Sequence, residues 1–305
     1  MSLSINTNTS SMVALETLNA TQSALSATEN AVSTGKKVAN ASDGPASFGI
    51  ASQMTGNISG QSAVNDGLSY ASAVVSSTNT AANQILSVLA EIQNAVTSVG
   101  NNSGSDTSLS QINDEITGYL GQIDTIAQNS TTNGVNLLSG GTTDGLSITA
   151  SSLNYVTGLQ GSLATVSSFK SLSSATGNTL SAMLGLTSAG VAGSVPTTNS
   201  LFASYTTGSI TAASLQSAIS KVQAAIVSMT NFTSQLGNNT KQIANLTTFG
   251  QSVTDNLTTG VGALTDADMS EESAKLTSLQ TKQSLAIKSL SIANGQSQNI
   301  LSLFQ

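Results

Sequence analysis

The sequence predicts a mainly α-helical protein in which long antiparallel helices from the two ends of the chain pair as a coiled coil. Thin heptad stripes run along both terminal segments, and stronger helical periodicity follows inside each of them. Only 3% of the 305 residues are aromatic and none is Trp, so large apolar side chains are too few for a thick globular core. Between the two helical halves the periodicity fades, which predicts a small α/β or β-containing central insert.

The stripe at the C-terminal end follows an alternating three–four spacing that is typical of a coiled-coil seam. It comprises Leu276, Leu279, Gln283, Ala286, Leu290, Ala293, Ser297, Ile300 and Phe304. Because the other positions are Gln, Ala and Ser, only five of its residues are large and apolar. This seam is too weak to hold a helix alone, so we expect it to pair with the opposite terminus and with further copies of the chain.

The N-terminal segment carries a matching stripe that begins at Met12. Leu18, Leu25 and Val32 recur every seven residues, and Ala14, Thr21 and Thr28 stand between them. This helix is predicted to end at Gly35, and the Ser-Asp-Gly-Pro run at 42–45 marks a break. Pro45 is well placed to begin the next helix.

Longer helices are predicted inside both terminal segments. Residues 46–99 have a helical pattern, although Asn65-Asp66-Gly67 locally predicts a turn. A polar loop at 101–106 precedes a second strongly periodic helix that starts near Leu109. In the second half, a three–four seam extends from Leu215 to Leu264, and an acidic joint at 265–273 leads into the C-terminal helix.

The middle of the chain is expected to contain short elements. LSIT at 146–149 and YVTG at 155–158 are candidate strands, whereas SLATVSSFKSL at 162–172 and LSAMLGL at 180–186 are candidate short helices. We therefore predict three domains. An inner terminal domain combines 1–40 with 266–305, a helical rod domain combines 41–145 with 208–265, and the insert covers 146–207.

The composition excludes several classes of function. The net charge is −7 and all eight cations are Lys, which argues against nucleic-acid binding. Without His or Cys the chain has no Ser–His or Cys–His pair and no His-ligand zinc site, so we predict no enzyme activity, no cofactor and no metal. The pairs of carboxylates, such as Asp114-Glu115 and Glu271-Glu272, are interpreted as solvated helix faces or caps.

Export and membrane insertion can also be judged from the sequence. No apolar run is long enough to span a membrane, and the polar start of the chain does not have the pattern of a secretory signal peptide. The absence of Cys fits a reduced compartment, chance, or an exported protein that assembly stabilises in place of disulfides. If the protein leaves the cell, we expect a route that needs no cleaved signal.

Several segments resemble those of bacterial flagellins. They are INTN at 5–8, TQSALSATENAVSTGKKVANASDGPASFGIAS at 21–52, VNDGLSYAS at 64–72, NGVNLL at 133–138 and IANGQSQNILSLFQ at 292–305. The resemblance covers roughly residues 1–140 and 210–305. It implies an inner coiled-coil domain, a rod domain and a small outer insert, and it implies that Asn65–Gly67 is helical despite the local turn pattern.

The resemblance also implies a function: a structural subunit that polymerises head-to-tail into the extracellular flagellar filament for swimming motility. Its partners would be further copies, an export chaperone and the export apparatus, and the filament cap and hook-junction proteins. We predict a polymerisation interface made of Leu15, Leu18, Leu25, Val32, Leu276, Leu279, Leu290, Ile300, Leu303 and Phe304. Because so thin a seam buries little apolar surface, both termini are expected to be disordered in the free subunit and to fold on polymerisation.

A second surface follows from the resemblance alone. Flagellins of many bacteria are sensed by a vertebrate Toll-like receptor, and the corresponding surface here lies around Val88, Glu91, Ile92 and Glu115. The family pattern has an Arg in this region and this chain has none, so we predict weak or absent recognition. Two other functions stay open: a hook–filament junction protein, which shares the terminal heptads, and a secreted coiled-coil adhesin. Growth seeded by filament fragments would favour the filament subunit, and a discrete small oligomer would favour the others.

Overall fold

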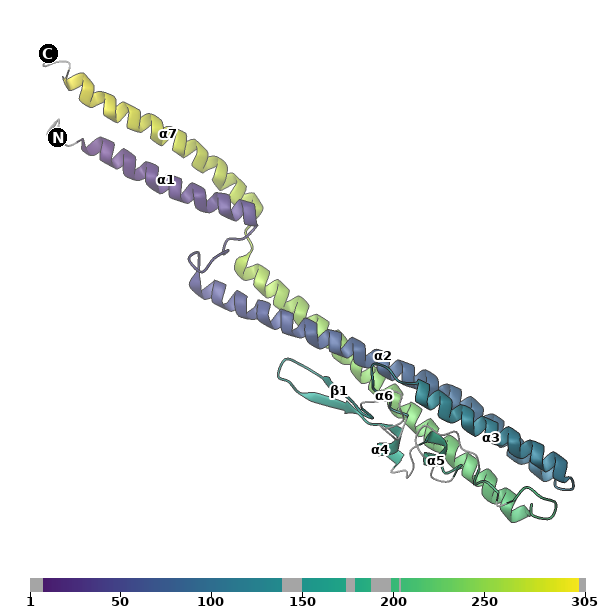
Figure 1. Ribbon diagram of the computed structural model, residues 1–305. Coiled ribbons are helices and arrows are strands. Elements are labelled where there is room, and N and C mark those ends of the chain that lie inside the picture. Colours follow the sequence, from purple (N-terminus) through teal and green to yellow (C-terminus); the bar gives the residue numbers. More distant parts are fainter. Residues whose placement is uncertain (1–7, 139–149, 174–178, 188–198, 203, 302–305) are drawn as a thin grey trace. The chain divides into compact units, whose positions relative to one another are not determined.

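The computed structural model describes residues 8–138, 150–173, 179–187, 199–202 and 204–301 (Figure 1). Side chains are described for all of these except 173 and 296–301. The helices are α1 (Thr9–Thr34), α2 (Pro45–Asn101), α3 (Asp106–Asn129), α4 (Phe169–Ser173), α5 (Leu180–Met183), α6 (Ala212–Thr265) and α7 (Met269–Leu301). Strands β1 (Leu153–Val156) and β2 (Leu163–Val166) form a sheet. The mainly α fold that the sequence predicted is confirmed.

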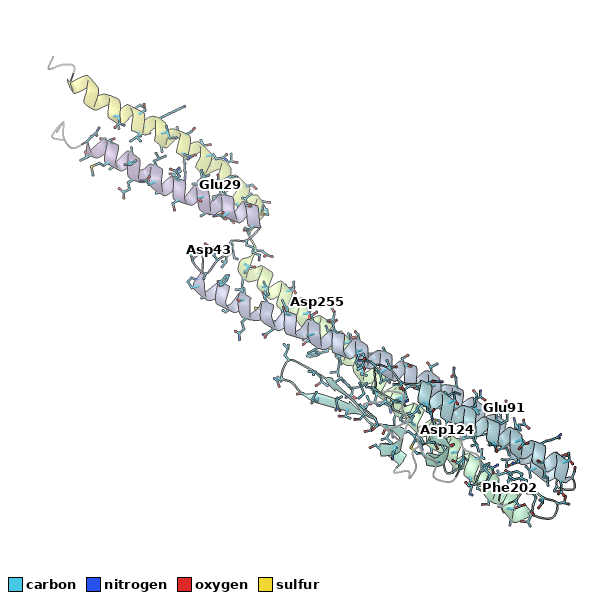
Figure 2. The ribbon with its side chains drawn as sticks, viewed as in Figure 1. Glu29, Asp43, Glu91, Asp124, Phe202 and Asp255 are labelled. Carbon is cyan, nitrogen blue, oxygen red and sulfur yellow. The ribbon has the colours of Figure 1, made fainter. Side chains whose placement is uncertain are left out.

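The ends of α1 and α2 are fixed by local chemistry. The Asn8 side chain caps α1 by accepting a hydrogen bond from Ser11 N at 3.1 Å, and Gly35 ends it at φ 68°. In the linker that follows, the Asp43 carboxylate accepts hydrogen bonds from the backbone N–H of Ala39 and Asn40 at 3.0 and 2.9 Å (Figure 2). Pro45 is the first residue of α2, where its fixed φ suits the first turn.

Helix α2 continues without interruption through Asn65–Gly67, as the resemblance implied. The reason is tertiary, because Val64, Leu68 and Ala71 on either side of this segment are buried in the core. Burial of this apolar face outweighs the local turn preference of Asn-Asp-Gly.

Helices α2 and α6 pack closely in an antiparallel arrangement. Gly250 of α6 lies against Asn65 and Gln61 of α2, and Gly100 of α2 lies against Leu215 of α6. Both pairs fit the same antiparallel register. Val222, Met229, Leu236 and Ile243 of the predicted α6 seam are buried in the core. Helix α3 contributes Leu109, Ile116 and Leu120 to the same core.

The described part of the middle segment belongs to this core as well. Strands β1 and β2 pair antiparallel with Leu153 opposite Val166, and both of these residues are buried. The candidate strand YVTG overlaps β1, and LSAMLGL contains α5, as predicted. The predicted helix at 162–172 is wrong in its first half, which is strand β2, because Leu163–Val166 alternates its faces and pairs with β1. The LSIT segment lies outside the described residues.

The chain divides into two compact units, which are described separately. One contains residues 1–59 and 254–305, and the other contains residues 60–253. The large core cluster lies entirely within the second unit. In the described part of the first unit the buried apolar residues are few: Leu25, Ala31, Val38, Ala51 and Leu279. Among the described residues, no helix is both long and apolar enough to cross a membrane.

Candidate assembly surface

Helices α1 and α7 lie side by side and antiparallel in the first unit (Figure 1). Near the chain termini, Asn8 Nδ2 donates to the Ala293 carbonyl at 2.9 Å, and Ser11 Oγ donates to Asn294 Oδ1 at 2.6 Å. At the other end of the pair, Ala267 N donates to the Gly35 carbonyl at 2.9 Å. These bonds set the register of the pair across the full described length of α1.

The pair buries the thin seam that the heptads predicted. Leu25 and Leu279 are buried, and Leu18, Val32, Leu276 and Leu290 are half-buried. Thr21 and Thr28 are buried between the apolar residues of α1. Leu15 is different, since 49% of its surface is exposed and it lies outside this seam. The Ile300 side chain, Leu303 and Phe304 lie outside what the structure describes.

The outer faces of the same pair carry large apolar side chains that the two helices do not cover. They include Met12, Val13, Leu15, Leu285, Ile287 and Ile292, and each of these six has between 49% and 68% of its surface exposed. Heptad reasoning missed most of these residues because it followed only the seam. Their presence on both helices means that α1 and α7 together leave much of their apolar surface in contact with solvent.

A groove of about 490 Å³ runs along one side of the pair. Val13, Ala14 and Thr17 of α1 and Leu285 and Ala286 of α7 are among its lining residues. Lys282 is the cation that lines it. A long apolar groove between two helices has the shape and chemistry that accept an apolar helix face.

The chain segment that follows α1 is joined by hydrogen bonds to the last turn of α6. Lys37 N and Val38 N both donate to the Thr265 carbonyl, at 2.7 and 3.3 Å, and Lys37 Nζ donates to the Ala263 carbonyl at 3.1 Å. Thr265 itself is buried. The sequence marked a break in both segments, but only the structure brings the two breaks together.

The residues of the predicted receptor surface separate into two groups. Val88 and Ile92 are buried in the core of the second unit, whereas Glu91 and Glu115 are exposed (Figure 2 labels Glu91). Tyr119 Oη donates to Glu115 Oε1 at 3.1 Å, and this hydrogen bond raises the pKa of the Tyr119 hydroxyl. Of the four predicted residues, only the two glutamates are therefore exposed to a partner.

The acidic residues of the described part of the chain can be compared with the requirements of a metal site. No group of three or more His, Cys, Asp and Glu residues is close enough there to hold a metal ion. The carboxylates of the acidic joint act as caps, because Asp268 Oδ1 accepts hydrogen bonds from Ser270 N and Glu271 N at the start of α7.

Comparisons with known proteins agree with the two-ended architecture. Residues 5–143 match the model of the bacterial flagellin N-terminal helical region, and residues 219–304 match that of the C-terminal helical region. Flagellin FljK of Caulobacter vibrioides is 32% identical over 302 residues, which cover 99% of this chain and 98% of the relative. Flagellin C of Rhizobium meliloti is 34% identical over 328 residues, with 99% of both chains covered.

A flagellin of Brucella melitensis is 32% identical over 302 residues, again covering 99% of each chain. The crystal structure of Bacillus cereus flagellin aligns with a TM-score of 0.40 and 16% identity, covering 59% of this chain and 86% of that one. Since the two family models match most of the sequence and the relatives match it over nearly its full length, the chain belongs to the bacterial flagellin family.

Proposed function

We propose that the α1–α7 pair is the element through which copies of this chain associate head-to-tail as structural subunits of the flagellar filament. The observation that carries the proposal is the set of exposed apolar side chains on the outer faces of the pair. When α1 and α7 bury the seam between them, these side chains on their other faces stay exposed. Neighbouring copies supply the missing apolar surface, and a head-to-tail contact that does not close generates an open helix.

Seeded growth tests this proposal. Purified subunits are mixed with short filament fragments, and elongation is followed by light scattering and electron microscopy. We expect growth on the seeds, with a rate that falls when Ile292→Ser removes an exposed apolar side chain from α7. A discrete small oligomer in place of growth would favour a hook–filament junction protein or an adhesin.

The matched control for Ile292→Ser is Leu163→Ser in β2. Leu163 is equally exposed, at 68% of its surface, but it belongs to the second unit. If assembly depends on the α1–α7 pair, elongation is lost or slowed by the α7 substitution and retained with the β2 substitution. Equal loss in both variants would count against the pair as the assembly element.

The predicted interface is part of this proposal. Leu18, Leu25, Val32, Leu276, Leu279 and Leu290 would act indirectly by closing the seam, and Leu15 would act directly from the outer face. Ile300, Leu303 and Phe304 extend the same stripe in sequence. The three-domain division at 40/41, 145/146, 207/208 and 265/266 likewise stays a prediction, for which the breaks after α1 and after α6 are the supporting observations.

Secretion and the non-self partners rest on family membership. Flagellins are structural proteins, so we propose no enzyme activity. Export through a dedicated apparatus with a chaperone would deliver subunits to the growing end of the filament, which a cap closes. Hook-junction proteins would hold the opposite end of the filament. The apolar groove between α1 and α7 would suit a chaperone helix before assembly.

Recognition by the vertebrate receptor would be weak. The exposed part of the predicted surface carries Glu91 and Glu115, and the chain has no Arg to replace the family's cation. A reporter-cell assay with the purified subunit is expected to give little response, and a strong response would refute this proposal.

A further inference from the structure

Asparagine followed directly by glycine occurs twice in the sequence, as Asn133-Gly134 and Asn294-Gly295. Such a pair loses its side-chain amide without an enzyme, because a glycine without Cβ allows its backbone N to approach the asparagine side chain closely. The glycine N attacks Cγ of the asparagine, and ammonia leaves as a succinimide ring closes. Water then opens the ring at either carbonyl, which gives aspartate or isoaspartate with no oxidation or reduction.

Asn294 lies near the end of α7, opposite the start of α1. Its Oδ1 accepts a hydrogen bond from Ser11 Oγ at 2.6 Å, and the neighbouring Ala293 carbonyl accepts one from Asn8 Nδ2 at 2.9 Å. Asn294 is nevertheless exposed. Water therefore reaches this residue, while hydrogen bonds to α1 hold this part of α7 in the pair.

The closed helix opposes loss of the Asn294 amide. Gly295 lies inside α7, so the hydrogen-bond ladder of the helix takes up its N–H. Helical dihedral angles at Asn294 also keep the flat succinimide ring from closing. The reaction thus requires this part of α7 to open first, and its rate follows the population of the open form.

Little apolar burial holds this end of α7 in place. Leu279 is the last buried residue in the part of α7 whose side chains are described, and Leu290 and Ala293 beyond it are only half-buried. Glycine inside a helix is destabilising relative to alanine. An added Cβ at Gly295 would meet no atom within 4 Å, so packing does not require a glycine there.

We propose that Asn294 is a deamidation site that closure of α1 on α7 protects, so that free subunits lose the amide faster than assembled ones. The comparison with assembled subunits rests on the proposed function, in which neighbouring copies hold the pair closed. Isoaspartate routes the main chain through the side-chain carbon and interrupts the helical ladder, and both products replace a neutral amide with a negative charge. A subunit that has lost this amide should therefore add to filaments more slowly.

The other Asn-Gly pair provides an internal reference. Asn133 and Gly134 have φ of 49° and 79°, and Thr132 and Val135 exchange two backbone hydrogen bonds of 2.9 and 3.0 Å around them. This turn belongs to the second unit, which has its own core. Substitutions in the α1–α7 seam should therefore leave the rate of amide loss at Asn133 unchanged.

The test follows amide loss in full-length free subunits in mildly alkaline buffer, with each site resolved by proteolysis and mass spectrometry. The rate at Asn294, divided by its rate in concentrated guanidinium chloride, should equal the open fraction that hydrogen exchange reports for the end of α7. Gln283, which is half-buried, is replaced in Gln283→Leu to close the seam, and Leu290→Ser opens it. We expect the rates of these two variants to differ severalfold, with Gln283→Leu the slower.

The matched control for the effect on growth is Gly295→Ala, whose added Cβ hinders ring closure and fits the helix without a clash. Free subunits are aged, and their seeded growth is compared with that of fresh subunits. We expect aged wild-type subunits to grow severalfold more slowly and aged Gly295→Ala subunits to retain their growth. Wild-type filaments of the same age should keep the amide of Asn294.

The outcomes separate the inference from the function. If the rate at Asn294 does not follow the open fraction, or if the seam variants change the rate at Asn133 equally, closure of the pair does not protect the site and the inference is overturned. If wild-type and Gly295→Ala subunits lose growth equally on ageing, the amide of Asn294 does not control assembly. If fresh wild-type subunits fail to grow on seeds, the proposed function fails, while the rates in free subunits still test the protection of Asn294.

Discussion

At the residue scale, Asn136 is the polar side chain on which the end of α3 depends. It is fully buried, and its Nδ2 donates to the carbonyls of Ala127 and Gln128 at 2.7 and 3.2 Å and to Thr131 Oγ1 at 3.0 Å. Its Oδ1 accepts from Leu138 N at 2.9 Å. One carboxamide therefore binds two of the last carbonyls of α3 and fixes the chain that follows.

We expect Asn136→Ala to lower the free energy of unfolding of the second unit by about 1–3 kcal/mol, since several buried partners lose their bond. Denaturant unfolding followed by circular dichroism measures this. Asn129→Ala is the control, because Asn129 is the exposed last residue of α3 and its replacement should change stability by no more than about 0.5 kcal/mol. Equal effects of the two substitutions would contradict the role given to Asn136.

Asp124, which Figure 2 labels, makes the free energy of unfolding depend on pH. Its carboxylate is 2% exposed and accepts hydrogen bonds from Ser181 N and Ser181 Oγ, both at 2.7 Å, which ties α5 to α3. Burial raises the pKa of this carboxyl above 3.8, although the bonds from Ser181 act in the opposite direction.

Because the pKa is higher in the folded state, the folded chain binds more protons than the unfolded chain between the two pKa values. This contribution to stability is fully present below pH 3.8 and is lost as pH rises through the folded pKa. We expect wild-type stability to decline over this window relative to Asp124→Asn, whose amide does not titrate. Urea unfolding at a series of pH values from roughly 3 to 7 measures the difference, and parallel curves for the two proteins would contradict it.

At the element scale, α1 ends where it does because Gly35 adopts a left-handed conformation. Its φ is 68°, and an added Cβ would meet no atom within 4 Å, so only the backbone resists substitution. Gly35→Ala is expected to destabilise the α1–α7 pair by about 1–2 kcal/mol. Gly35→Asn is the control and should cost less, since Asn tolerates this conformation. Thermal unfolding followed by circular dichroism ranks the two variants, and an Asn variant weaker than the Ala variant would be unexpected.

A polar substitution in the seam of the α1–α7 pair should reduce seeded growth strongly. Leu290 is half-buried in a seam whose neighbouring positions are Ala286 and Ala293. We expect Leu290→Ser to abolish seeded growth and to leave the second unit folded, because that unit has its own core. Leu290→Met keeps the apolar volume and should still grow. Unfolding of residues 60–253 in the Ser variant would show that the loss of growth cannot be separated from a loss of stability in the second unit.

At the scale of the whole molecule, the two units differ in how much apolar surface they bury. The second unit has a large continuous core, whereas the described part of the first unit has few buried apolar residues and several exposed ones. We expect hydrogen exchange in the free subunit to be fast in α1 and α7 and slow in the core-facing parts of α2, α3 and α6. Polymerisation should then slow exchange in α1 and α7. Strong protection of both terminal helices in the free subunit would contradict folding on assembly.

The sequence by itself determined the mainly helical fold, the seams at both ends, the breaks near Gly35 and the acidic joint, because heptads, caps and turn residues act over a few neighbouring positions. It also indicated the flagellin family through motifs placed at both termini. Only the tertiary structure decided that Leu163–Val166 is a strand, that Val88 and Ile92 are buried and that Leu15 lies outside the seam. Those outcomes depend on partners distant in the sequence. The same is true of Asn294, whose hydrogen bond from Ser11 exists only because α1 and α7 lie side by side.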